Sequence, residues 1–266
     1  FDSMMKFALR ETKTPNCEIK LSFPLLRLAI MDPKFFIFQL LPTVIDGNGS
    51  SLKDGYPAEI KLAILFGHLM TNFVSNLKLT YDAKARKLFL LALLSFYDTS
   101  FFTHAVVPDP QFEGDTEYQI QHSDGMSGIF LTLTSQFGLI MSLASRFLEE
   151  IHETPSGDCK TYHSQGTYDD EELVLIKAEE EEEELDGDPD NEYIKEFRVP
   201  DSSEKHRFTE LVLKEDPIFN VNLKSFVQSK MSQMAGNVDN YNVLLSSVSK
   251  ETLDDLQLQY DRTGSS

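Results

Sequence analysis

The sequence predicts an all-α protein, a HEAT-repeat solenoid of stacked antiparallel helix pairs that carries one long acidic loop. Apolar residues recur at spacings of three and four along most of the 266-residue chain, which is the period of an amphipathic helix. No segment has the strict alternation that indicates a strand. The helices come in pairs of about 40 to 47 residues, the size of a HEAT unit. Since one pair cannot bury its apolar face alone, neighbouring pairs are expected to stack.

The first helical region lies between Leu25 and Val44. Its first apolar patch ends at Ile30, and the pair Asp32-Pro33 is typical of an N-cap followed by proline in the first helical turn. We expect Pro42 to kink or end the second helix, because proline has no N–H to donate. The run DGNGSS over residues 46–51 is a break.

A helical hairpin is predicted next. Pro57 begins the first helix, and its apolar residues fall on one face. Residues 76–81 are predicted to be a polar join, and the second helix is expected from Asp82 to Tyr97. The two apolar stripes consist of Ile60, Ala63, Ile64, Gly67, Met70 and Val74, and of Ala85, Leu88, Phe89, Ala92, Leu93 and Phe96.

The longest predicted helix runs from Met126 to Ile151, after an irregular stretch rich in proline and acid. Residues 125–145 contain no charged side chain, and this length is sufficient to span a membrane. One third of these residues are nevertheless polar, which favours the alternative of a helix buried on most sides in a protein core.

The C-terminal third is predicted to be helical again after Asp201. Asp216-Pro217 is interpreted as a stop, residues 218–222 as extended, and residues 237–242 as a turn. Asn222 and Ser249 are predicted to cap the two remaining helices. The predicted organisation is therefore helical repeats over 1–160, an acidic insertion over 161–205, C-terminal helices over 206–260 and a tail over 261–266.

The acidic segment, residues 169–196, has 15 acidic residues against two lysines, a net charge of −13 out of −19 for the chain. Its carboxylates repel one another, so it is expected to be solvated. Composition alone leaves two interpretations open, a passive linker and a contact for basic partners. The candidate cargo-binding residues are Asp169, Asp170, Glu171, Glu172, Glu179, Glu180, Glu181, Glu182, Glu183, Glu184, Asp186, Asp188, Asp190 and Glu192.

No enzyme or cofactor signature is present. Cys159 and His163 are at most half of a zinc site, and residues 186–197 lack the glycine and glutamate that a calcium loop needs at its sixth and twelfth positions. There is no phosphate-binding glycine-rich loop and no nucleophile elbow. We therefore expect no catalysis, no cofactor and no metal site.

The bulk composition restricts partners and compartment. A pI near 4.6 disfavours nucleic acid, whose phosphates would be repelled. Two cysteines far apart in sequence are typical of a reducing compartment. The opening FDSMMKFALR has neither an initiator Met nor a signal peptide, so we expect a piece of a longer protein.

The C-terminal arrangement resembles that of importin-beta family nuclear import receptors (karyopherins). An acidic loop precedes KEDPIFNVNLKSFVQSKMSQMAGN, residues 214–237, and YNVLLSSVSKETLDDLQ, residues 241–257. The likeness lies in the Asp216-Pro217 pair, the amphipathic helix with Phe226 near its middle, and the short last helix around Leu253. Within the family, it is most similar to importin nine and its fungal counterpart. The chain is identified as the C-terminal portion of such a receptor.

The resemblance implies binding of basic nuclear cargo such as histones or TATA-binding protein, and release by Ran-GTP in the full protein. It also implies shuttling between cytoplasm and nucleus. The acidic loop either attracts cargo or occupies the receptor's own basic surface and inhibits binding. A helical scaffold, or an acidic histone-chaperone-like protein whose segment is a spacer, remains the alternative.

Overall fold

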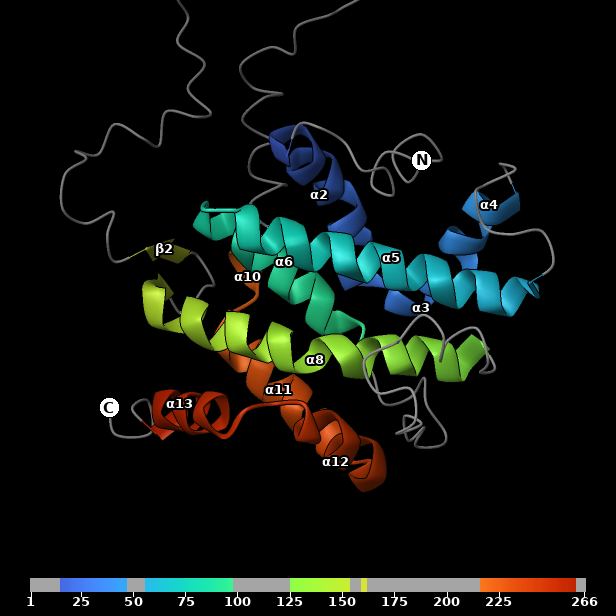
Figure 1. Cartoon of the computed structure of the whole chain (residues 1–266). Coiled ribbons are helices and arrows are strands. Elements are labelled where there is room, and N and C mark those ends of the chain that lie inside the picture. Colours follow the sequence, from blue (N-terminus) through green and yellow to red (C-terminus); the bar gives the residue numbers. More distant parts are fainter. Residues whose placement is uncertain (1–14, 47–55, 98–124, 154–158, 162–215, 262–266) are drawn as a thin grey trace, which may run out of the picture.

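The computed structural model describes residues 15–46, 56–97, 125–153, 159–161 and 216–261. These residues form an array of helices with one small β-hairpin (Figure 1). The all-α, repeat-solenoid prediction is confirmed. The elements are α2 (Pro15–Met31), α3 (Pro33–Phe35), the π-helical turn η1 (Phe36–Leu40), α4 (Leu41–Asp46), α5 (Ala58–Leu79), α6 (Ala83–Ser95), α8 (Gly125–Glu150), β1 (Ile151–Glu153), β2 (Cys159–Thr161), α10 (Pro217–Asn220), α11 (Leu223–Ala235), α12 (Val238–Ser246) and α13 (Lys250–Asp261).

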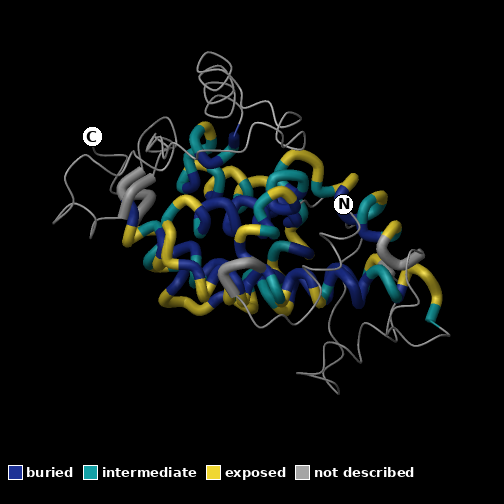
Figure 2. Tube along the Cα trace, turned by 90° about the horizontal axis from the view of Figure 1, so that it is seen from above, coloured by how far each residue is buried: buried dark blue, intermediate teal, exposed yellow. Residues whose placement is uncertain are grey.

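Helix α6 is the hub of the fold. It packs against α2, α5, α8, α10, α11 and β2, and from Ala85 to Tyr97 only Arg86 is not fully buried. Helices α5 and α8 lie side by side along most of their lengths, and α12 and α13 pack on the other side of α8 (Figure 1). Helix α11 packs against α6 and α12. Buried residues follow the inside of this stack and exposed residues its outside (Figure 2). The core is therefore continuous through the helix pairs.

Two helices are long and apolar enough to cross a membrane by length and composition, Ala58–Leu79 and Met126–Glu150. In the folded chain, 61% and 56% of their apolar windows are buried. They bury this surface largely against each other. A core helix of a packed protein passes the same test of length and hydropathy.

Capping residues fix several helix starts as the sequence predicts. The Asp32 carboxylate accepts a hydrogen bond from the Phe35 N–H at 2.8 Å, and the side chains of Asp82 and Asn222 cap α6 and α11 in the same way. Pro42 does not end the helix, which continues as α4. Immediately before it, the chain passes through the π-helical turn η1, where the Leu41 N–H donates to the Phe36 carbonyl five residues back. A π turn immediately before proline accommodates the missing donor.

The expected polar join of residues 76–81 is wrong for its first four residues. Helix α5 continues to Leu79 because Asn76 and Leu77 are buried and extend its packed face. The connection to α6 is only Thr80–Asp82, and the predicted hairpin is otherwise confirmed.

Two C-terminal predictions are wrong in part or in whole. Of residues 218–222, which are predicted to be extended, only Val221 and Asn222 have extended backbone. Residues 218–220 belong to the short helix α10, because Asp216 caps it by accepting the Ile218 N–H at 3.0 Å. Residues 237–242 are not a turn, because Asn237 caps α12, which extends to Ser246. In both cases a polar residue interpreted as a helix breaker is an N-cap.

The expectation of no strand also fails in one place. Strands β1 and β2 pair antiparallel, with Ile151 opposite Thr161 and Glu153 opposite Cys159. The predicted end of the long helix at Ile151 is therefore the first residue of a strand. Each strand has three residues, too few for an alternating pattern to be visible in the sequence.

Candidate functional site

The acidic segment, residues 169–196, lies outside the described residues, and so do all its candidate cargo-binding residues, from Asp169 to Glu192. The structure instead shows the elements that flank it in the chain. Strand β2 ends at Thr161, and the chain is described again from Asp216. Both β2 and α10 pack against α6, so the two ends of the intervening stretch meet the same helix (Figure 1). We call this region the segment base. It consists of Arg27, Lys84, Arg86, Lys87, Glu150, Asp216, Ile218 and Phe219.

Asp216 is the central residue of the C-terminal side of the base. Its side chain is only 6% exposed. One carboxylate oxygen accepts the Ile218 N–H, and the other accepts Nε and Nη2 of Arg27 at 3.0 and 2.5 Å. The carboxylate thus caps α10 and joins it to α2 across 189 residues of sequence. Charge-assisted bonds of this kind are stronger than neutral ones, and they satisfy a buried anion.

Lys87 holds α10 from the opposite side. Its side chain is fully buried, and Nζ donates to the Ile218 carbonyl at 2.7 Å. Lys84, one turn earlier on α6, places its ammonium 4.8 Å from the centre of the Phe219 ring. Ile218 is buried and Phe219 is half-buried. A helix of four residues has little apolar surface of its own, so these polar contacts fix its position.

Arg86 connects the same part of α6 to the N-terminal side of the base. Its guanidinium forms an ion pair with Glu150 at the end of α8 and lies 4.5 Å from the centre of the Phe147 ring. Strand β1 begins at the next residue, Ile151. The first turns of α6 therefore hold both flanks of residues 162–215.

Charge is distributed unevenly between the acidic segment and the rest of the chain. The described residues contain 13 Lys and Arg against 14 Asp and Glu, so this part is nearly neutral. The acidic segment has two lysines against 15 acidic residues. Most of the negative charge of the protein is thus concentrated in residues 169–196, within the stretch 162–215 whose flanking elements β2 and α10 pack against α6.

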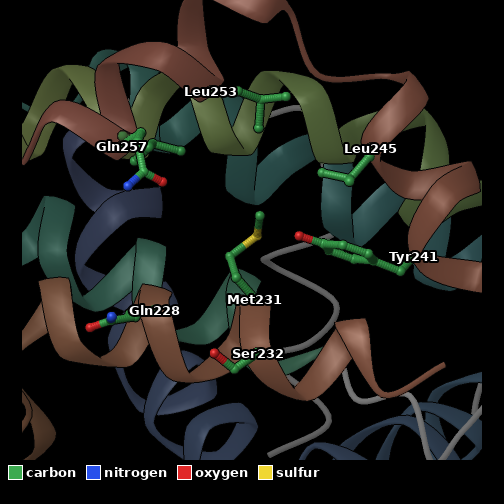
Figure 3. A pocket seen from close by; sticks show the side chains of 8 residues that line it. Gln228, Met231, Ser232, Tyr241, Leu245, Leu253 and Gln257 are labelled. Atoms are coloured by element: carbon green, nitrogen blue, oxygen red, sulfur yellow. The ribbon is translucent and has the colours of Figure 1, made fainter. Parts of the chain in front are cut away.

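A cavity lies between α11, α12 and α13. It has a volume of about 540 Å³ and is lined by Gln228, Met231, Ser232, Tyr241, Leu245, Leu253, Leu256 and Gln257. The Met231 side chain, from α11, points into the cavity, and Gln228 and Gln257 lie at the end opposite Tyr241 (Figure 3). The residues that line it include no charged side chain.

The described residues contain no group of three or more His, Cys, Asp and Glu arranged to hold a metal ion. Cys159 lies in β2, and His163 falls outside the described residues.

Comparison with known proteins identifies the repeats. The chain matches the family described as importin-11-like, TPR repeats, over residues 1–260. It belongs to the importin-11-like TPR-repeat family. A curated relative, the importin beta-like protein KAP120 of Saccharomyces cerevisiae, is 25% identical over 185 residues, which cover 67% of this chain and 14% of the yeast protein. No solved structure matches the chain significantly.

The resemblance to importin-beta receptors is thus confirmed at the level of the family. The finer likeness to importin nine is carried by neither comparison, since the matching family is the importin-11-like one and the relative is a different importin beta-like protein. The chain spans 14% of the length of that relative. The cargo and other partners of the whole receptor are therefore treated as proposals below.

Sequence reasoning placed the acidic segment of this importin-11-like chain but missed its base. Two signals were available. Arg27 is a single basic residue inside the apolar run LLRLAI, and Lys87 follows Arg86 directly before the apolar run LFLLALL. Asp216-Pro217 also repeats the pair Asp32-Pro33, which had been interpreted correctly as a helix start.

Proposed function

We propose that this chain is part of a karyopherin-type nuclear import receptor and that its acidic segment binds basic nuclear proteins such as histones or TATA-binding protein. The observation that carries the proposal is the concentration of a net charge of −13 in residues 169–196, beside a nearly neutral helical body. Membership of the importin-11-like family supports the receptor class.

The physical basis is electrostatic attraction by many weak contacts. A single exposed ion pair contributes only about 0.2 to 1 kcal/mol, so strength comes from the number of carboxylates. A concentrated negative field raises the rate of encounter with a cationic partner about 10- to 1000-fold, and salt screens it over about 8 to 10 Å. The same carboxylates compete with DNA phosphates for the basic face of the cargo.

In the full receptor, we propose that Ran-GTP controls cargo release and that the protein shuttles between cytoplasm and nucleus. Ran control and shuttling are expected of a whole importin-beta-type receptor, and the chain covers only part of the length of its yeast relative. The helical repeats supply a large packed surface, and the acidic segment supplies recognition by charge. Nucleic acid is not proposed as a direct partner, because its phosphates would be repelled.

The test replaces the 15 acidic residues of 169–196 by Gly and Ser at equal length, and measures binding of purified core histones at low and high salt. Affinity should fall, and the dependence of log Kd on log salt should become flatter, because fewer ion pairs form. A matched control scrambles the order of the same 28 residues, which preserves the charge. The scrambled chain should bind like the original.

Three other outcomes would redirect the assignment. Unchanged affinity and salt dependence would make the segment a passive spacer. Tighter binding after replacement would make it autoinhibitory. Loss of binding in the scrambled control would show that a particular sequence, rather than charge, is recognised.

A further inference from the structure

The first half of α8 carries a cluster of side-chain hydroxyl groups that bond to carbonyls of the same helix. The Thr132 hydroxyl donates to the Gly128 carbonyl at 3.2 Å, and the Thr134 hydroxyl donates to the Phe130 carbonyl at 2.9 Å. The Ser135 hydroxyl donates to the Thr132 carbonyl at 2.8 Å. Each of these carbonyls also has a place in the backbone ladder of α8, so it serves two donors.

A further hydroxyl comes from outside the helix. Tyr97 follows the end of α6 and is buried, and its hydroxyl donates to the Leu133 carbonyl at 2.8 Å. The centre of its ring lies 4.9 Å from the centre of the Phe137 ring, one turn further along α8. In a regular α-helix the Leu133 carbonyl accepts the Phe137 N–H. Tyr97 therefore holds the buried side of α8 at one level of the helix.

A carbonyl that serves two donors makes the backbone bond less costly to open. The oxygen has two lone pairs, and the hydroxyl keeps it satisfied when the helix N–H moves away. Serine and threonine bonded in this way weaken and often bend a helix. The N–H that is released needs water. The partner of the Thr132 carbonyl in the ladder is the N–H of Gln136, which is half-buried beside the exposed Ser135, so water can reach it.

The part of α8 beyond this cluster supports the C-terminal helices. Gly138 lies against the end of α12, so close that a Cβ there would be 1.9 Å from the Ser247 carbonyl oxygen. Helix α13 also packs against α8 (Figure 1). A bend near Leu133 therefore changes the angle between the first turns of α8 and the two last helices.

We propose that α8 contains a hinge between Gly128 and Gly138. Its pivot is the bond from the Tyr97 hydroxyl to the Leu133 carbonyl on the buried side. The backbone bond that opens joins the Thr132 carbonyl to the Gln136 N–H on the solvent side. Opening there makes α8 convex toward water and curves it around the core. The stack of helix pairs can thus change its curvature at this point. The inference concerns the helical body alone and does not depend on the proposed function.

Amide hydrogen exchange in the whole 266-residue chain tests the bond that opens. Ser135→Ala should slow exchange at the Gln136 N–H about fivefold, because the Thr132 carbonyl then bonds to that N–H alone. The matched control is Ser142→Ala, which makes the same gain in helix propensity. The Ser142 hydroxyl forms no hydrogen bond with the part of the chain that the structure describes. Exchange at Gln136 should therefore be nearly unchanged in the control.

A distance measurement tests whether the opening moves the helices. Spin labels are placed at Met126 in the first turn of α8 and at Leu258 on α13, which are both exposed, after the native Cys17 and Cys159 are replaced by serine. The distribution of distances between the labels should become narrower in Ser135→Ala and stay broad in Ser142→Ala.

Two results would overturn the hinge. Faster or unchanged exchange at Gln136 in Ser135→Ala would show that the hydroxyl does not weaken the helix. A distance distribution of equal width in Ser135→Ala and in the original chain would show that the opening moves nothing. Because Ser135 is exposed, its substitution should leave the chain folded, which far-ultraviolet circular dichroism checks.

Discussion

At Gly138, in the middle of α8, a single added methyl group meets the backbone of another helix. A Cβ built on this residue would lie 1.9 Å from the Ser247 carbonyl oxygen and 2.8 Å from its carbonyl carbon. Ser247 closes the C-terminus of α12, and its own N–H and hydroxyl both bond to the Leu244 carbonyl. The oxygen is therefore part of a fixed helix end and not a flexible side chain that can move aside.

The cost of Gly138→Ala follows from this geometry. Ordinary van der Waals contact begins at 3.4 Å, so α8 and α12 must separate by about 1.5 Å, the difference from 1.9 Å. Overpacking typically costs about 1 to 3 kcal/mol, and a clash with backbone belongs at the upper end of that range. The better helix propensity of alanine offsets about 1 kcal/mol of this loss in the free energy of unfolding. The expected net loss is about 2 kcal/mol, or a fall in Tm of about 4 to 8 °C for a chain of this size.

Thermal unfolding followed by far-ultraviolet circular dichroism measures the effect, and amide hydrogen exchange in α12 locates it. Gly236→Ala is the matched control, because its Cβ would lie 3.2 Å from the Gln233 carbonyl oxygen with φ at −64°. Only a small change is expected there. A Gly138→Ala chain as stable as the original would refute the packing of α12 on α8 described here.

Three further changes test the segment base and the core. Arg27→Gln removes one partner of the buried Asp216 carboxylate, and should destabilise the chain by about 1 to 3 kcal/mol with faster amide exchange at Ile218. Lys87→Met keeps the volume but leaves the Ile218 carbonyl without this donor, and chemical denaturation should show a loss of about 1 to 3 kcal/mol. Burial raises the pKa of Tyr97 well above its ordinary value of 10.0, so the unfolded chain loses this proton first and stability should fall as pH rises above 10.0. Tyr97→Phe should remove that part of the alkaline loss in denaturation midpoints measured from pH 8 upward, whereas an unchanged alkaline loss would contradict the assignment.

The sequence was sufficient to predict the helices whose apolar faces are long. Helices α5, α6 and α8 each bury apolar residues that recur at spacings of three and four. The start of α6 is also marked by its cap, Asp82, and the start of α5 by Pro57. It was insufficient where a polar residue had two possible roles. Asp216 and Asn237 were interpreted as a stop and a turn, yet each caps a helix. Local sequence does not distinguish a cap from a break when the helix that follows is short.

The segment base could not be predicted because its contacts join residues far apart in the chain. Arg27 and Asp216 are separated by 189 positions, and Lys87 and Ile218 by 131. Arg27 taken alone contradicts the apolar pattern of α2, and only its partner Asp216 explains it. An isolated charge within an apolar run is thus better interpreted as a sign of a distant polar contact than as an error in the helix assignment.

The basic residues of α6 bear on whether the acidic segment attracts a partner or inhibits the protein itself. Autoinhibition needs cationic side chains on the helical body that are available to the glutamates. Arg86 already pairs with Glu150, Lys87 is fully buried against the Ile218 carbonyl, and Lys84 lies over the Phe219 ring. Three positive charges of α6 are thus engaged in holding α10 and the end of α8. The described body as a whole is nearly neutral, so it should compete only weakly for the 15 carboxylates. These two observations favour attraction of a separate basic protein, which is the function proposed above, over autoinhibition.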